Sequence, residues 1–193
     1  MNYDIELFRA INGLAGRNVS ADAVFIFGAK WLIFVMAMLI VAYVAWAWKT
    51  SEFEHRVEHA WHITVGFALA FVTERLIGFL WFRPRPFVAL PDVVKLIEKS
   101  AEEKSFPSGH TTSAFVLAFG LLLHHRKWGA ALCVLAAWVS FSRVFVGVHY
   151  PTDLLGGVVV AAVAALATRP VAKAIEPYLE FLPVFRKYKQ RDA

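Results

Sequence analysis

Residue types that bind and transfer phosphate gather in three short segments of this sequence. Residues 81–87 contain a pair of arginines separated by proline, residues 106–110 read Phe-Pro-Ser-Gly-His, and residues 142–153 contain arginine, histidine and aspartate. Guanidinium groups bind phosphate oxygens in a bidentate manner and stay charged at any physiological pH. Histidine and carboxylate side chains supply nucleophiles and proton donors. The three segments together therefore predict chemistry on a phosphoryl group.

The second segment predicts an anion-binding site at the beginning of a helix. Ser108 is a preferred N-cap residue type, and Gly109 lets an anion approach the backbone closely. The N–H groups of a first helical turn and the positive end of the helix dipole attract negative charge. Arg143, together with Arg85 or Arg83, would complete a cradle for phosphate oxygens.

The histidines predict how the reaction proceeds. Pro151 suits the first position of a helix, which places Asp153 in the first turn and His149 just before the helix. A carboxylate bound to one ring nitrogen of His149 leaves the other nitrogen free to attack phosphorus. His110, from another helix, would act as general acid toward the leaving oxygen. The pattern thus predicts an in-line displacement through a phosphohistidine, which water hydrolyses in a second step.

Each segment alone also has a purely structural interpretation. Residues 81–87 would serve as the basic end of a membrane helix, residues 106–110 as a helix start, and residues 142–153 as a polar clasp between helices. A metal site is not predicted, because the segments offer a single carboxylate whereas Mg²⁺ and Ca²⁺ favour several oxygen ligands. A zinc site built from the histidines and this carboxylate would leave the arginines without a role. No metal and no cofactor are therefore expected.

The composition indicates a membrane protein of one domain. The chain has 193 residues, of which 59% are hydrophobic and 18% charged, whereas soluble domains are roughly 45–50% apolar and about 25% charged. This composition excludes a disordered chain, and the single cysteine, Cys133, excludes an internal disulfide. The net charge of +5 arises from basic residues placed between apolar blocks, so a nucleic-acid partner is not predicted.

The apolar blocks predict an all-α, polytopic membrane helix bundle with about five transmembrane helices. The blocks are Ala23–Trp48, Ala60–Phe82, Thr111–Leu123, Trp128–Val148 and Tyr150–Thr168. A span needs roughly 20 residues, so the short block 111–123 is expected to begin below the membrane surface with polar residues at its mouth. Asp4–Leu14 predicts a short helix in the membrane interface. The single domain, 1–193, consists of a core over residues 20–168 and a basic tail over residues 169–193.

This arrangement of spans places the N-terminus and the three segments on one side of the membrane. Basic residues flank the spans on the opposite side, at Lys49, Arg56, Arg126, Lys127, Arg169 and Lys173. The positive-inside rule therefore makes this opposite side cytoplasmic. We expect a multi-pass protein of the bacterial inner membrane whose site faces the periplasm or the exterior.

The three segments resemble the signature of the type 2 phosphatidic acid phosphatase superfamily, which reads K-x6-R-P, P-S-G-H and S-R-x5-H-x3-D. The second and third segments match in full, the third over residues 142–153. The first matches at Arg85, but Gly78 replaces the signature lysine, and Arg83 or Arg75 is the expected substitute. The opening Met-Asn-Tyr-Asp-Ile, the Arg-Pro-Arg-Pro-Phe-Val stretch and the short length most resemble bacterial BcrC-type undecaprenyl-diphosphate phosphatases.

This resemblance implies a metal-independent phosphatase of a lipid phosphate, with His149 as the nucleophile. It implies that Asp153 orients the nucleophile and that His110 is the acid. The implied phosphate-binding residues are Arg85, Ser108, Gly109 and Arg143. The leading expectation is dephosphorylation of undecaprenyl diphosphate to the monophosphate, with the membrane and a lipid-linked phosphate as partners. The alternatives are phosphatidic acid or phosphatidylglycerophosphate as substrate, or a non-catalytic lipid-phosphate binder or translocator, which would not need His149.

Overall fold

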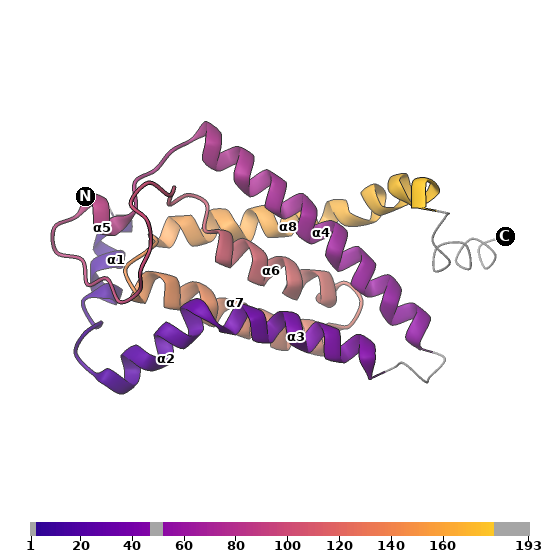
Figure 1. Cartoon of the computed structure of the whole chain (residues 1–193), viewed down its shortest axis with the longest axis horizontal. Helices are drawn as coiled ribbons and strands as arrows, with labels where there is room; N and C mark the ends of the chain where they lie inside the picture. Colours follow the sequence, from indigo (N-terminus) through magenta and orange to yellow (C-terminus); the bar gives the residue numbers. More distant parts are fainter. Residues whose placement is uncertain (1–2, 47–51, 180–193) are drawn as a thin grey trace.

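The computed structural model describes residues 3–46 and 52–179, and the regular structure within these ranges is helical. The helices are α1 (Tyr3–Asn12), α2 (Val19–Lys30), α3 (Leu32–Ala45), α4 (Phe53–Leu80), α5 (Pro86–Ala89), α6 (Gly109–Leu122), α7 (Arg126–Phe145) and α8 (Pro151–Ile175), followed by the 3-10 helix η1 (Glu176–Leu179). The long helices lie side by side along the long axis of the molecule (Figure 1). The prediction of an all-α bundle is confirmed.

The bundle is built as expected for a membrane protein. Among the described residues, three helices are long and apolar enough to cross a membrane alone, namely α4 over His55–Leu80, α7 and α8. The pair α2 and α3 passes the same test together, and α6 is a shorter apolar helix. The outward side chains of Leu155 and Leu166 on α8 are 65% and 72% exposed, whereas its buried face consists mostly of glycine and alanine. Large apolar side chains outside and small residues between helices are typical of packing in a bilayer.

The first apolar block, Ala23–Trp48, forms a broken rather than a continuous helix. The helices α2 and α3 meet at Trp31 with a bend of 54°. In a continuous helix the carbonyl of Ala29 would accept a hydrogen bond from residue 33, and here it accepts one from Arg143 Nη1 at 2.9 Å. A side chain that enters the backbone ladder of a helix is an established cause of kinks. The bend therefore follows from a contact with α7.

Helix α6 is enclosed by α4, α7 and α8. Its side chains Ala114, Val116 and Ala118 are at most 1% exposed. Ser108 is the N-cap, because its Oγ accepts a hydrogen bond from the N–H of Thr111 at 3.5 Å. The expected helix start at this position is present, and the enclosing helices keep a short helix buried over its whole length.

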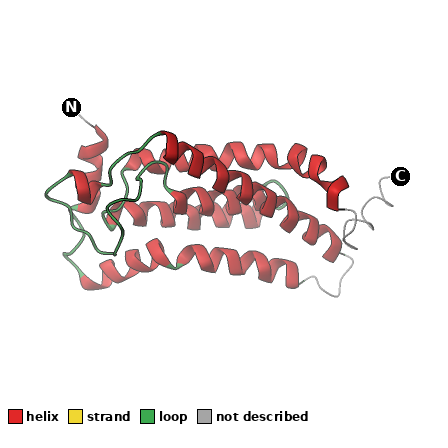
Figure 2. Ribbon diagram, turned by 45° about the horizontal axis from the view of Figure 1, so that its top comes forward, coloured by secondary structure: helices red, strands yellow, loops and turns green. Residues whose placement is uncertain are grey.

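The long loops gather at one end of the bundle, where α1 and α5 also lie (Figure 2). Helix α1 is docked onto this end: Asn12 Nδ2 donates to Phe145 O at 2.8 Å and to Val94 O at 2.9 Å. Phe8 on the same helix is 1% exposed. Gly147 has a φ of 85°, and a Cβ there would lie 2.5 Å from Val94 O, so the turn after α7 requires glycine.

Helix α8 continues to Ile175, beyond the expected end of the core at residue 168. Pro170 lies within the helix, where it removes one backbone hydrogen bond without ending the helix. The 3-10 helix η1 then extends to Leu179. The remainder of the basic tail, residues 180–193, lies outside the described residues, so its arrangement stays a prediction.

Candidate active site

The three phosphate-binding segments meet at one end of the bundle. Arg85 precedes α5, Gly109 and His110 begin α6, Arg143 lies in the last turn of α7, and His149 lies in the loop between α7 and α8. These residues line one cavity, whose volume is about 940 Å³. Residues far apart in the sequence are thus brought to a common cavity, as the sequence predicts.

His149 is 2% exposed, and its Nε2 lies 3.2 Å from Arg85 Nη1. Because a guanidinium group has only donors, we assign Nε2 as the unprotonated nitrogen and Nδ1 as the protonated one. Nδ1 lies 3.5 Å from Asp153 Oδ2, which is longer than a strong hydrogen bond. Burial lowers the pKa of His149 from 6.5 to about 3, against the opposite effect of Asp153. The ring is therefore neutral at neutral pH, as a nucleophile must be.

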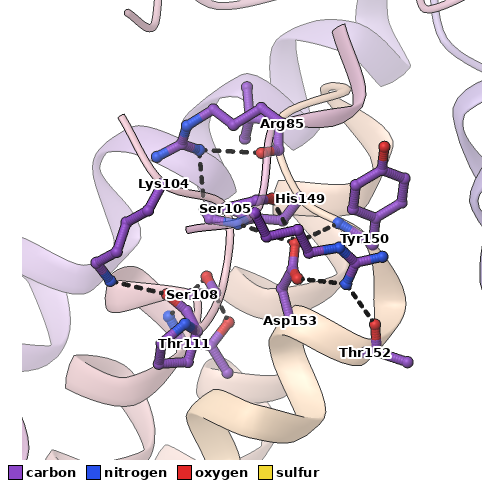
Figure 3. Close-up of polar contacts among 12 residues, drawn as sticks. Arg85, Lys104, Ser105, Ser108, Thr111, His149, Tyr150, Thr152 and Asp153 are labelled. Carbon is purple, nitrogen blue, oxygen red and sulfur yellow. Dashed lines mark hydrogen bonds and ion pairs between the residues drawn. The ribbon is translucent and has the colours of Figure 1, made fainter. Parts of the chain in front are cut away.

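Asp153 is fully buried, and donors hold both of its carboxylate oxygens (Figure 3). Ser105 Oγ donates to Oδ2 at 2.5 Å, and the N–H of Tyr150 donates to the same oxygen at 2.8 Å. Arg83 Nη1 donates to Oδ1 at 2.7 Å. The backbone N–H of Ser108 donates to the carbonyl of Asp153 at 3.0 Å, which ties the start of α6 to α8. The carboxylate therefore has one orientation beside the histidine.

Arg83 lies behind Asp153 rather than in the cavity. Its guanidinium group donates to Asp153, to Thr152 Oγ1 and to Asp4 Oδ2, each at 2.7 Å. It also stacks over the Tyr150 ring, 4.0 Å from the centroid. Burial opposes its charge, but the hydrogen bonds and charges of the aspartates raise the pKa of Arg83. Among the described residues that line the cavity Arg83 is absent, so its placement supports a role in holding the aspartate and gives no support to the expected phosphate contact.

Arg143 is the most deeply buried cation of the cavity, with 2% of its surface exposed. Its Nη1 donates to the carbonyl of Ala29. Within residues 3–46 and 52–179, its Nε and Nη2 have no hydrogen-bond partner. Buried donors without partners lower stability, and a guanidinium group with donors on two nitrogens can take a phosphate in bidentate fashion. Arg143 is thus arranged to bind an anion.

Arg85 is 4% exposed and is held by the loop that precedes α6. It donates from Nη1 to Val148 O at 3.0 Å and from Nη2 to Glu103 Oε2 at 3.2 Å. Burial lowers the pKa of Arg85, and the negative charge of Glu103 opposes this effect. A phosphate that binds Arg85 therefore competes with the carboxylate of Glu103.

The first turn of α6 closes the cavity on one side. Ser108 is fully buried, and its Oγ is 3.1 Å from the Thr111 hydroxyl that donates to it. Gly109 and His110 follow it and line the cavity. The N–H end of the helix and the imidazole of His110 therefore line the same cavity as His149.

Neither Arg83 nor Arg75, the residues expected to replace the signature lysine, is the cation that lies beside Gly78. Arg75 lines the cavity but is 66% exposed, with its Nε 3.6 Å from Glu74 Oε2. The side chain that lies against Gly78 is that of Lys104, which also lines the cavity. Lys104 and Ser105 belong to none of the three segments predicted from the sequence, although they directly precede Phe-Pro-Ser-Gly-His. Charged and hydroxyl residues next to a candidate anion site were the available signal.

In the described part of the chain, no group of three or more histidine, cysteine, aspartate or glutamate residues is placed to hold a metal ion. A mechanism without a metal stays a prediction and is tested below.

Comparison with known proteins identifies the family. The model of the PAP2 superfamily matches residues 59–176, which include the three segments. The chain belongs to this superfamily. It is 32% identical to the undecaprenyl-diphosphatase BcrC of Bacillus subtilis over 94% of this chain and 90% of that protein. It is also 32% identical to the bacitracin transport permease protein BcrC of Bacillus licheniformis, over 97% of this chain and 90% of that protein.

A solved structure supports the same fold. The crystal structure of Aquifex aeolicus LpxE superposes with a TM-score of 0.71 at 23% identity and covers 88% of this chain and 96% of that one. The predicted family is therefore confirmed by the sequence comparisons, and the helical fold by the structural one. The chain is a phosphatase and a multi-pass membrane protein.

Proposed function

We propose that this phosphatase removes the terminal phosphate of undecaprenyl diphosphate and releases the monophosphate. The observation that carries the proposal is the composition of the cavity. One part is lined by charged and polar groups that include Arg143 and His149, and another part by apolar side chains of α3 and α4. A substrate that joins a diphosphate to a long hydrocarbon chain matches both parts.

The apolar part follows the facing sides of α3 and α4. It is lined by Ile33, Phe34, Ala37, Ile40, Val41, Val44, Ala45, Ala60, Ile63, Phe67 and Phe71. In a bilayer these helices lie at the depth of lipid chains, so an isoprenoid chain can occupy this surface while the diphosphate stays at the polar end. A water-soluble phosphomonoester would leave these side chains without a role. The relative from Bacillus subtilis named as an undecaprenyl-diphosphatase supports the same assignment.

The proposed reaction consists of two displacements on phosphorus. In the first, His149 Nε2 attacks the terminal phosphorus, a P–N bond forms, and the P–O bond to the bridging oxygen breaks. The leaving group is undecaprenyl phosphate, and His110 donates a proton to it. Burial lowers the pKa of His110 to about 3, with a further effect of Arg143, so the negative charge of the bound diphosphate is needed to keep this ring protonated. In the second, His110 accepts a proton from water, the water oxygen bonds to phosphorus, and the P–N bond to His149 Nε2 breaks, which releases inorganic phosphate. Asp153 stabilises the charged ring, and Arg143 with the N–H of Gly109 balances the negative charge of the transition state.

We propose that the site end of the bundle faces the periplasm or the exterior of a bacterial cytoplasmic membrane. The N-terminal helix and the long loops lie at this end (Figure 1). The opposite end carries Arg56 at the start of α4, Arg126 and Lys127 at the start of α7, and Lys173 in the last turn of α8. An excess of such residues marks the cytoplasmic side. Labelling of single cysteines placed in the 90–104 loop of intact cells with a membrane-impermeant reagent tests this orientation.

The substrate is tested with purified protein in detergent. Undecaprenyl diphosphate, phosphatidic acid and phosphatidylglycerophosphate are compared, and the first is expected to have the highest kcat/KM. Activity should persist in excess EDTA and be inhibited by orthovanadate, which mimics five-coordinate phosphorus. A preference for either glycerolipid would overturn the substrate assignment, and loss of activity on chelation would require a metal in the mechanism.

The mechanism is tested at His149. His149→Ala should lower phosphate release by more than about 10³-fold, because no other group replaces a nucleophile. His55→Ala is the matched control, since this exposed histidine lies at the opposite end of the bundle. Terminally radiolabelled substrate should leave label on wild-type protein denatured at alkaline pH and none on His149→Ala. Equal activity of His149→Ala and wild type would contradict the assigned nucleophile and favour a binding protein.

A further inference from the structure

The cavity contains a cation that the mechanism above does not use. Lys104 lies in the loop before α6, and its side chain is 16% exposed. Its ammonium group contacts Glu74 and donates to Pro107 O at 3.4 Å. The side chain extends toward the segment that begins α6 (Figure 3). Lys104 therefore brings a positive charge to the end of α6 that attracts anions.

Gly78 on α4 makes room for this lysine. A Cβ at position 78 would overlap Cδ and Cε of Lys104 and would lie 2.8 Å from its Nζ. Gly78 lies in the last turn of α4, and the absence of a Cβ there leaves the space through which the Lys104 side chain passes. The superfamily signature has its lysine at this same position, and the chain supplies a lysine from a loop instead.

Glu74 determines where the ammonium group lies. Glu74 stands one turn before Gly78 on α4 and is 6% exposed. Its carboxylate contacts Lys104, and a Cβ on Gly109 would lie 3.3 Å from Glu74 Oε1. The ion pair is thus placed directly against the first residue of α6. A phosphate bound there by the helix N–H groups would lie within reach of Lys104.

We propose that Lys104 is a phosphate-binding residue that replaces the signature lysine across Gly78, with Glu74 neutralising it until substrate binds. This inference rests on the proposed function, because it concerns the same phosphate site. When the phosphoryl group enters, the ammonium group of Lys104 exchanges its hydrogen bond to the Glu74 carboxylate for one to a phosphate oxygen, and no covalent bond changes. The site then contains three cations around the phosphate, which are Arg85, Lys104 and Arg143.

The first test is the loss of the cation. Lys104→Ala should lower kcat/KM for undecaprenyl diphosphate and raise the Ki of orthovanadate by about 10- to 100-fold each, the range for a charge-assisted hydrogen bond. Lys95→Ala is the matched control, because this lysine lies in the same loop, pairs with exposed Glu98 and does not line the cavity among the described residues. Wild-type values for Lys104→Ala would overturn the proposal.

The second test separates phosphate binding from neutralisation of Glu74. In Glu74→Gln with Lys104→Met, no carboxylate is left unpaired, so a purely structural lysine would no longer be needed. The proposal expects this double variant to keep a raised Ki for orthovanadate. Recovery of wild-type kcat/KM and Ki in the double variant would show that Lys104 only balances Glu74.

The third test transfers the lysine from position 104 to position 78. Gly78→Ala should displace the Lys104 side chain and lower activity, although alanine favours the helix. Gly78→Lys combined with Lys104→Ala returns the lysine to α4 and should recover most of the activity lost in Lys104→Ala. A swap variant no more active than Lys104→Ala would overturn the replacement across Gly78.

These outcomes are distinct from a failure of the proposed function. If wild-type protein hydrolyses phosphatidic acid rather than undecaprenyl diphosphate, the substrate assignment fails. The Ki of orthovanadate still decides the role of Lys104 in that case, because orthovanadate needs only the phosphate site. If orthovanadate inhibits wild type and Lys104→Ala equally, the inference fails while the substrate assignment stands.

Discussion

The arginines on the two sides of the Asp153–His149 pair differ in how their donors are used. Behind the aspartate, Arg83 donates to Asp153, Asp4 and Thr152 at 2.7 Å each. In the cavity, Arg143 donates to one backbone carbonyl, and within the described ranges its Nε and Nη2 have no partner. A saturated network holds side chains in one arrangement, whereas buried donors without partners lower stability and favour a ligand. The backing region, which consists of Arg83, Thr152 and Asp4, therefore holds Asp153 in position, whereas the cavity is suited to bind an anion.

The N-terminal helix belongs to the backing region. Asp4 on α1 accepts hydrogen bonds from the N–H of Thr152 at 2.9 Å and from its hydroxyl at 2.6 Å, besides that of Arg83. Helix α1, which was expected to lie in the membrane interface, is thus also hydrogen-bonded to the first turn of α8. This contact connects the beginning of the chain to the carboxylate that orients the nucleophile.

Replacing each arginine by methionine gives the largest expected contrast. Arg143→Met should lower kcat/KM by about 10²–10³-fold, as expected for loss of a donor that stabilises transition-state charge. Its Tm in detergent should be unchanged or higher, because a buried group with unpaired donors is replaced by an apolar one of similar length. Arg83→Met should instead lower Tm by several degrees, because it leaves Asp153 buried without its ion-pair partner.

Activity and thermal unfolding of both variants are measured in the same detergent without phosphate. Arg9→Met serves as the control, since Arg9 forms an exposed ion pair with Asp92 away from the cavity. A large loss of Tm in Arg143→Met together with full stability of Arg83→Met would reverse the assignment of the two regions.

His110 also lines the cavity, and its replacement has a smaller expected effect, which depends on the substrate. A general acid matters most when the leaving group is a poor one. His110→Asn should lower kcat/KM about 10²-fold for phosphatidic acid, whose leaving group is an alcohol. The loss for undecaprenyl diphosphate should be smaller, because the leaving phosphate already has a pKa of roughly 6. Equal losses on both lipids would show that His110 does not protonate the leaving group.

The sequence predicted those parts of the site that depend on local rules. Ser108 is an N-cap by residue type, and Pro151 begins α8 and so places Asp153 in its first turn. The lengths of the apolar blocks predicted a bundle of membrane-spanning helices, because a helix that crosses the bilayer requires a minimum number of apolar residues. The meeting of the segments at one end followed from the alternation of spans. These predictions need no knowledge of which side chains touch across the bundle.

The parts that the sequence did not reveal depend on contacts between distant residues. The break at Trp31 lies beside the Ala29 carbonyl, which accepts a hydrogen bond from Arg143 on another helix. Arg83 holds Asp153 whereas Arg85 lines the cavity, and this difference depends on Asp4, which is distant in sequence but bonded to Arg83 and to the first turn of α8. The replacement across Gly78 likewise becomes visible only when α4 and the loop before α6 are side by side. No spacing rule along the chain contains this information.

The smallest expected effect is the contribution of His149 to the pH dependence of the free energy of unfolding. Burial lowers the pKa of His149 from 6.5 to about 3 in the folded protein. Between these values the unfolded chain binds a proton that the folded protein excludes, so this histidine destabilises the fold as the pH decreases below 6.5. The cost is about 1.4 kcal/mol per pH unit in this window, equivalent to a few degrees of Tm for a protein of this size.

The measurement is the Tm of wild type and His149→Asn in phosphate-free buffer between pH 7 and pH 5. Every other titrating group is common to both proteins, so the difference between the two curves isolates His149. The curve of wild type should decrease more steeply on acidification, and His55→Asn, altered at an exposed site, should follow wild type. Addition of orthovanadate should reduce the difference, because an anion beside the ring favours its charged form. Parallel curves for wild type and His149→Asn would mean that the His149 ring is already solvated or charged in the folded protein. The difference in hydrogen bonding between the backing region and the cavity would then not explain how His149 is kept neutral.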